Sequence, residues 1–129
     1  MTEHGGWQPP PGLRWTAGAI ALALVGLLFH QGAQPYAVGL IPSPWDKLAH
    51  VALFGVIAAL SWLMTGGRRP WASVAIAVII GVADEVAQWA LPGRRPGWDD
   101  LLADALGAGL VVWMLGRWAR RAGTGSEGR

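Results

Sequence analysis

The chain has 129 residues, of which 53% are hydrophobic and only 14% are charged, whereas soluble domains usually carry about 25% charged residues. A mean hydropathy of +0.35 also excludes an ordinary soluble domain and favours a chain that lies mostly in lipid. The absence of cysteine excludes a disulfide framework, a thiol nucleophile and a thiolate metal site.

The basic character of the chain, with an isoelectric point near 9.9, does not predict nucleic-acid binding. Its arginines stand in short groups between or after apolar runs, whereas tracking a phosphate backbone requires a basic stripe. Several of the nine tryptophans lie near the ends of these runs, where interfacial aromatic side chains of membrane proteins gather. We therefore expect membrane lipid as a partner and no nucleic acid.

Residues 1–12 are polar and rich in Gly and Pro, which predicts a flexible tail. An apolar run follows from Leu13 to Phe29 and can extend toward Tyr36 to complete a span of about 20 residues. Because one base precedes the run and no A-x-A cleavage site follows it, we expect an uncleaved helix instead of a signal peptide. Residues 31–44 contain five Gly or Pro residues and cannot form a continuous helix.

A second helix is predicted to begin at the Ser43-Pro44-Trp45-Asp46 segment and to run to about Met64. Serine would cap this helix, proline would take its first position, and the acid would lie in its first turn. A polar turn at residues 65–70 ends the run.

Two further apolar runs predict helices at residues 71–91 and 98–118, separated by a break at residues 92–97. Residues 119–129 are basic and then Gly- and Ser-rich, which predicts a disordered tail. A soluble bundle would need a polar stripe on every helix, and these runs lack one. The predicted fold is therefore all-α: a bundle of four transmembrane helices over residues 13–118.

Arginines predict the orientation of this bundle. Three basic groups fall on one side of a four-span topology: Arg14, Arg68 with Arg69, and Arg117 with Arg120 and Arg121. The positive-inside rule makes that side cytoplasmic and places both termini there. Arg94 and Arg95 then lie in an outer loop, against the rule, which suggests a separate role for this pair.

Ionisable residues gather toward the opposite, outer side. Six of the eight acids fall there: Asp46, Asp84, Glu85, Asp99, Asp100 and Asp104. Helical spacing puts three pairs each on one face of a helix: Asp46 with His50, Glu85 with Gln88, and Asp100 with Asp104. Asp46, Asp99 and Asp100 also suit helix N-termini, and Lys47 suits a helix end from which its amine reaches the interface.

Glu85 lies within an apolar run, where an unpaired carboxylate is costly, so it should face the bundle interior and have a partner. The candidate partners are Lys47, His50, Gln88, Arg94 and Arg95. Asp84 points about 100° away from Glu85 on an ideal helix and has no assigned place. Ala103, Gly107 and Gly109 form a face of small residues, for which helix packing within the monomer is the simplest meaning.

Four segments together resemble the VanZ-like family of bacterial membrane proteins. Its pattern, D-K-x-x-H, E-x-x-Q, an Arg after a Pro-Gly turn, and D-x-x-x-N-x-x-G, falls here on Asp46, Lys47, His50, Glu85, Gln88, Arg94, Asp100, Asp104 and Gly107. The chain departs from this pattern at Asp104, where the family usually has Asn. The resemblance implies a multi-pass protein of the bacterial cytoplasmic membrane and marks these residues as site candidates. The family's namesake is associated with resistance to the glycopeptide teicoplanin.

The sequence leaves several functions open, and binding of a lipid head group or cell-envelope precursor is preferred. The predicted binding residues are Asp46, Lys47, His50, Glu85, Gln88, Arg94, Asp100 and Asp104. An enzyme acting on a lipid-linked substrate is the alternative, with His50, Glu85 and Asp104 as acid–base candidates and Arg94 stabilising charge. Ion movement is less favoured, because the first and second helices are bare of charge toward the cytoplasm and a relay across the membrane therefore lacks inner stations. No cofactor and no metal are expected, and the oligomeric state is open.

Overall fold

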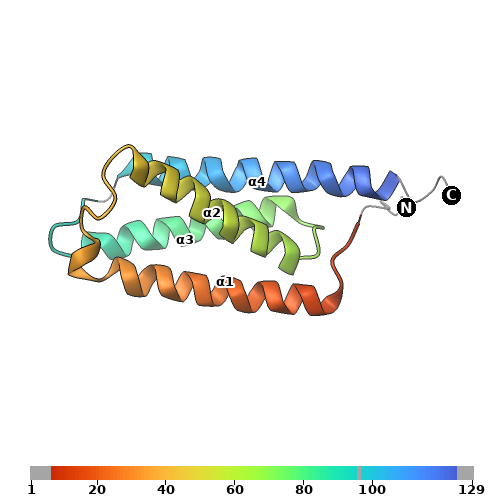
Figure 1. Ribbon diagram of the computed structural model, residues 1–129, viewed down its shortest axis with the longest axis horizontal. Coiled ribbons are helices and arrows are strands. Elements are labelled where there is room, and N and C mark those ends of the chain that lie inside the picture. The colour runs from red at the N-terminus through yellow and green to blue at the C-terminus, as the bar shows by residue number, and fades with distance from the viewer. Residues whose placement is uncertain (1–6, 96, 125–129) are drawn as a thin grey trace.

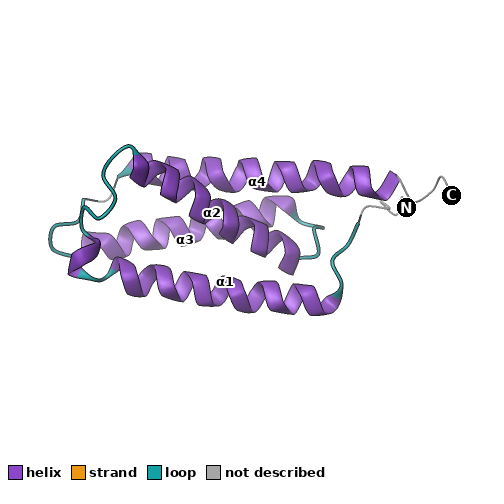
Figure 2. Ribbon diagram, in the orientation of Figure 1, coloured by secondary structure: helices purple, strands orange, loops and turns teal. Residues whose placement is uncertain are grey.

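The computed structural model describes residues 7–95 and 97–124, and within these ranges the chain is entirely helical apart from its connections (Figure 2). It contains α1 (Pro11–Gly32), α2 (Trp45–Met64), α3 (Pro70–Trp89) and α4 (Trp98–Thr124), with a short 3-10 helix, η1 (Pro35–Ala37), between α1 and α2. The predicted all-α class and the count of four long helices are confirmed.

The four helices alternate in direction, so the connections between them lie at two opposite ends of the bundle (Figure 1). We call the end with the α1–α2 and α3–α4 connections, residues 33–44 and 90–97, the polar end. The opposite end, with the α2–α3 connection at residues 65–69, the start of α1 and the last turns of α4, is the basic end. All three groups of arginines lie at the basic end, as predicted, and the cytoplasmic placement of that end stays a prediction.

Close packing of α2 against α4 holds the bundle together. A Cβ added at Gly107 would lie 2.2 Å from the carbonyl oxygen of Val51, so the two backbones touch there. The core continues along α2 through Phe54, Ile57 and Trp62, all of which are buried. Gly107 therefore packs within the monomer, as predicted, whereas a Cβ at Gly109 would meet nothing within 4 Å.

The outer surface of the bundle is apolar, as a lipid-exposed surface must be. All four helices are long and apolar enough to cross a membrane. Large apolar side chains are exposed on each of them, among them Leu22 on α1 (78% exposed) and Ile79 on α3 (66%). On α1 the only buried residue is Ala17. The chain is a multi-pass membrane protein.

Several predicted boundaries differ from the structure. Helix α2 begins at Trp45 with Pro44 at its N-cap and no side-chain cap, so the predicted Ser43 cap is wrong. Helix α4 continues to Thr124, which makes residues 119–124 helical where a disordered tail was predicted. At the other terminus, the Trp7 ring packs against Trp62 and Trp118. The remaining tail residues, 1–6 and 125–129, lie outside the described part of the chain.

Candidate functional site

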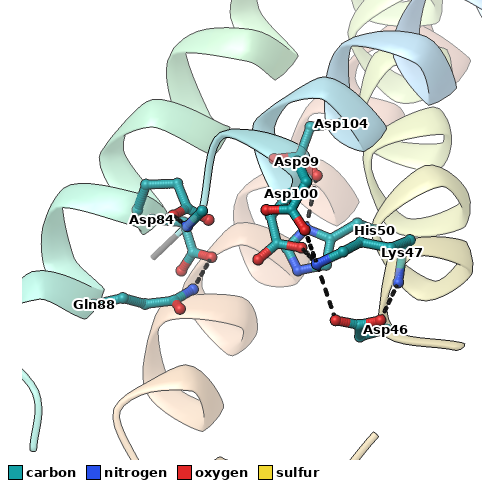
Figure 3. Close-up of polar contacts among 10 residues, drawn as sticks. Asp46, Lys47, His50, Asp84, Gln88, Asp99, Asp100 and Asp104 are labelled. Atoms are coloured by element: carbon teal, nitrogen blue, oxygen red, sulfur yellow. Dashed lines mark hydrogen bonds and ion pairs between the residues drawn. The ribbon is translucent and has the colours of Figure 1, made fainter. Parts of the chain in front are cut away.

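The polar end brings together every carboxylate of the described residues, and Figure 3 shows the five aspartates among them. This follows from helix direction: Asp46 begins α2, Asp84 and Glu85 lie near the end of α3, and Asp99, Asp100 and Asp104 lie at the start of α4. The predicted clustering is therefore confirmed as geometry. Several of the individual contacts, however, run between helices, whereas the Gln88–Asp84 hydrogen bond runs along α3.

Lys47 links the N-termini of α2 and α4. Its Nζ lies 3.0 Å from Asp46 Oδ2 and 2.9 Å from Asp99 Oδ2, and it also pairs with Asp100. The lysine therefore neutralises acids at the starts of two helices, and its amine does not simply extend to the membrane interface. Because all three of its hydrogen-bond donors have acceptors within the protein, Lys47 has a structural role in this end of the bundle.

His50 pairs with Asp104 one helical turn further into the bundle. The His50 Nδ1 lies 2.7 Å from Asp104 Oδ1, and the Asp104 side chain is 1% exposed. A Cβ at Gly81 would lie 2.6 Å from Asp104 Oδ2, so α3 makes room for this carboxylate only because Gly81 has no side chain. The His50 ring also stacks on Phe54 with a 5.9 Å centroid distance. Packing and pairing thus fix the orientation of the imidazole.

Glu85 binds the backbone of α4 instead of a charged side chain. Its Oε2 accepts a 2.8 Å hydrogen bond from the Gly97 N–H, just before α4 begins, and its Oε1 is buried without a partner among the described residues. The candidate partners named from sequence, which included Gln88 and Arg94, are therefore wrong. A carboxylate next to the first N–H groups of a helix is favoured by the positive end of the helix dipole.

Asp84 is the functional candidate that sequence reasoning missed. It is 4% exposed, and its Oδ2 accepts a 2.7 Å hydrogen bond from the Gln88 amide, one turn along α3. Gln88 thus pairs with Asp84 and not with Glu85. The signal was present in α3, because the buried small residues Ser73, Ala77 and Gly81 define a face that continues through Asp84.

Arg94 closes the polar end over the last turn of α1. Its Nη2 donates a 2.7 Å hydrogen bond to the Gly32 carbonyl oxygen, and its Nε is buried without an acceptor among the described residues. Neither Asp100 nor Glu85 forms an ion pair with it within those residues. A cation at a helix C-terminus interacts favourably with the dipole and with the unpaired carbonyl groups.

A cavity of about 560 Å³ opens between these groups and α1. Part of its lining is polar and includes Asp46, His50, Asp84, Gln88, Arg94, Arg95 and Asp100, with Gln31 and Tyr36 near the end of α1. The rest of the lining is mostly apolar and includes Leu24, Leu27 and Leu28 of α1, Leu53 of α2 and residues 37–41 of the connection. The cavity is therefore amphipathic and lies at the end of the membrane-spanning helices.

The predicted site residues divide into two groups around this cavity. Five of the eight predicted binding residues line it: Asp46, His50, Gln88, Arg94 and Asp100. Lys47, Glu85 and Asp104 lie outside the lining and bind other protein groups. Of the three acid–base candidates, His50 alone lines the cavity. The described residues contain no group of three or more acidic or His side chains placed to hold a metal ion.

The sequence pattern of the VanZ/LLP1 family matches residues 14–119, which include all four helices and every residue of the polar cluster described above. The chain belongs to the VanZ/LLP1 family. Neither a curated protein nor a solved structure matches the chain. Family membership agrees with a multi-pass membrane protein and places the cavity within the region that this family shares.

Proposed function

We propose that this VanZ/LLP1 protein binds a lipid or a lipid-linked envelope precursor in the cavity at the polar end. The observation that carries the proposal is the mixed lining of that cavity, in which charged and amide side chains occur together with leucines. A hydrocarbon chain would lie against the leucines of α1, and the head group would contact His50, Asp84 and the two arginines. A cavity of about 560 Å³ is within the usual range of small-molecule sites, about 300–1,000 Å³.

The polar side chains of the lining offer specific chemistry for a head group. Arg94 and Arg95 line the cavity without a carboxylate at ion-pair distance among the described residues. A guanidinium binds phosphate or carboxylate oxygens through parallel hydrogen bonds. His50 adds an imidazole of fixed orientation. These donors support an anionic head group, while Asp84 and Gln88 can accept hydrogen bonds from hydroxyl or amine groups.

The membrane orientation predicted from the arginines indicates on which side of the membrane the ligand would be found. If the basic end faces the cytoplasm, the polar end faces outward, where lipid-linked precursors of the envelope are used. Proton or ion movement through the bundle is not favoured, because the described residues contain no acid at the basic end and thus no chain of carboxylates across the membrane.

The binding proposal is tested by filling the cavity. Ala49 lines it, whereas Ala52, three residues further along α2, is exposed on the surface of the bundle and does not line it. Protein purified from bacterial membranes in mild detergent should retain a lipid species detectable by mass spectrometry. Ala49→Phe should release that species and Ala52→Phe should retain it. Identical lipid profiles in both variants, with both proteins folded, would refute binding in this cavity.

An enzyme is the second candidate, and the His50–Asp104 pair is the observation that favours it. A buried carboxylate on Nδ1 orients an imidazole and leaves Nε2 to exchange a proton with a bound substrate. Under this hypothesis Asp104 is the acid that acts with His50, whereas Glu85, the third acid–base candidate, lies outside the cavity lining. The retained lipid should then be converted by the wild-type chain, while His50→Gln should still bind it and leave it unchanged. No conversion by the wild-type chain would reject the enzyme.

A contribution to teicoplanin resistance is a separate proposal that rests on the family resemblance alone. It is tested by expressing the chain in a glycopeptide-sensitive bacterium and measuring the inhibitory concentration of teicoplanin. Ala49→Phe is the matched negative control, because it blocks the cavity while leaving the charged residues in place. An equal inhibitory concentration with and without the wild-type chain would contradict the proposal.

A further inference from the structure

We propose a second binding site at the basic end, which takes the head group of an anionic phospholipid. A cavity of about 860 Å³ lies there between the α2–α3 connection, the start of α3 and the last turns of α4. Its lining includes Trp62, Trp71 and Trp113 together with Arg68 and Arg120. This cavity shares no lining residue with the one at the polar end, so the inference is independent of the function proposed above.

Charge identifies the class of ligand. Arg68 approaches the cavity from the α2–α3 connection and Arg120 approaches it from α4, and both are exposed. All acids of the described residues lie at the opposite end of the bundle, so no described carboxylate competes for these guanidinium groups. Basic pockets between transmembrane helices bind anionic lipid head groups. The absence of a described acid also argues against a quaternary ammonium ligand, which an aromatic lining alone would suit.

The tryptophans give the cavity the character of a membrane interface. Trp71 is 72% exposed at the start of α3, where the head-group region of the bilayer lies, and Trp113 on α4 is 56% exposed. Trp62 is 2% exposed, and its indole N–H is buried with no acceptor among the described residues. Buried donors without a partner are rare in proteins, and an oxygen of a bound head group would be the missing acceptor.

Two glycines leave room for the cavity at the basic end. Gly67 has a φ of +71°, and a Cβ there would lie 2.8 Å from the Trp62 ring. Gly109 lines the cavity from α4, and a Cβ there would meet nothing within 4 Å. The apolar side chains Val74 and Val112 continue the lining toward the bundle. Head-group charges can thus lie near the arginines while an acyl chain runs along the valines.

The contribution of positive charge to lipid binding is tested by substituting two neighbouring arginines. Arg68 lines the cavity, and Arg69 does not. Binding of phosphatidylglycerol and phosphatidylcholine to the full chain is measured by native mass spectrometry in neutral detergent. The wild-type chain should bind phosphatidylglycerol more tightly. Arg68→Gln should weaken this binding about fivefold, the effect of about one interfacial basic residue, and Arg69→Gln should leave it unchanged. Equal losses in both variants would show diffuse attraction to the basic end and refute a site.

A second experiment fills the cavity at the basic end with a side chain and leaves the charge of the protein unchanged. Gly109→Leu places a side chain in the cavity, whereas Gly26→Leu adds the same side chain to an exposed position of α1 that also has nothing within 4 Å. Gly109→Leu should reduce phosphatidylglycerol binding to the level of phosphatidylcholine, and Gly26→Leu should bind like the wild-type chain. Circular dichroism confirms the helical content of both. Unchanged lipid preference in folded Gly109→Leu would overturn the proposal.

Discussion

Gly107→Ala should separate α2 from α4 and disturb the His50–Asp104 pair. The added Cβ would lie 2.2 Å from the Val51 carbonyl oxygen, so the helices must move apart by about 1 Å to restore van der Waals contact. Overpacking against a rigid backbone costs about 3 kcal/mol, and the better helix propensity of Ala returns about 1 kcal/mol. We expect a net loss of about 2 kcal/mol in the free energy of unfolding.

The same displacement should reach the polar end. Val51 follows His50 directly, and Gly107 lies less than one turn after Asp104, so a shift at this contact lengthens the 2.7 Å hydrogen bond between the two side chains. Lipid retention by Gly107→Ala should therefore fall even under conditions in which the protein is folded.

Gly109→Ala is the control, because its Cβ meets nothing within 4 Å. It should raise stability by up to about 1 kcal/mol through helix propensity alone. Both variants are unfolded by titrating SDS into mild-detergent micelles, with tryptophan fluorescence as the signal. If Gly107→Ala is as stable as Gly109→Ala, the two helices do not touch at Gly107 and the packing argument is refuted.

Three further outcomes are expected. Asp104→Asn, the residue usual in the family, should keep the fold but weaken the bond to His50 by about 1 kcal/mol, because a charge-assisted hydrogen bond becomes neutral; unchanged stability would mean that the pair is uncharged. Arg94→Ala should destabilise the protein by about 1–3 kcal/mol through the unpaired Gly32 carbonyl, and Arg94→Lys should restore part of this loss, which thermal unfolding measures. The chain contains no native cysteine, so single cysteines can replace the exposed Leu40 and Gln8. An impermeant thiol reagent added to intact cells should label Leu40→Cys. Labelling of Gln8→Cys alone would reverse the predicted orientation.

The helices and the polar end were predictable because they depend on local properties of the sequence. Apolar runs of about 20 residues with Gly- and Pro-rich breaks indicate transmembrane helices. Alternating helix directions then place Asp46, Glu85 and Asp100 at one end without further information. Boundaries such as the end of α4 were less predictable, because a basic segment after a span can continue the helix into water.

The pairing of side chains was not predictable in the same way. Helical spacing showed which acids share a face, but Asp100, which pairs with Lys47, and Asp104, which pairs with His50, lie on α4, at positions set by the register of α2 against α4. That register depends on the backbone contact at Gly107. Asp84 and Glu85 differ by about 100° of rotation about α3, so choosing between them requires knowledge of which face of α3 is buried. The position of a carboxylate along its apolar run does not show which face of the helix is buried.

The contacts at the polar end divide the family-pattern residues by what they bind. Lys47 and Asp104 form pairs between α2 and α4, and Glu85 binds the Gly97 N–H just before α4, so each contact fixes the position of α4 relative to α2 or α3. Gln88 instead faces the cavity and holds Asp84, whose carboxylate has no ion-pair partner among the described residues. A buried carboxylate without a cation is costly in the low dielectric of a membrane. Packing does not require a carboxylate at position 84, because the buried Ala77 and Gly81 show that this face of α3 accommodates small side chains. A ligand group that donates hydrogen bonds to Asp84 would offset that cost, which makes this residue, more than Glu85, the acid expected to contact the ligand.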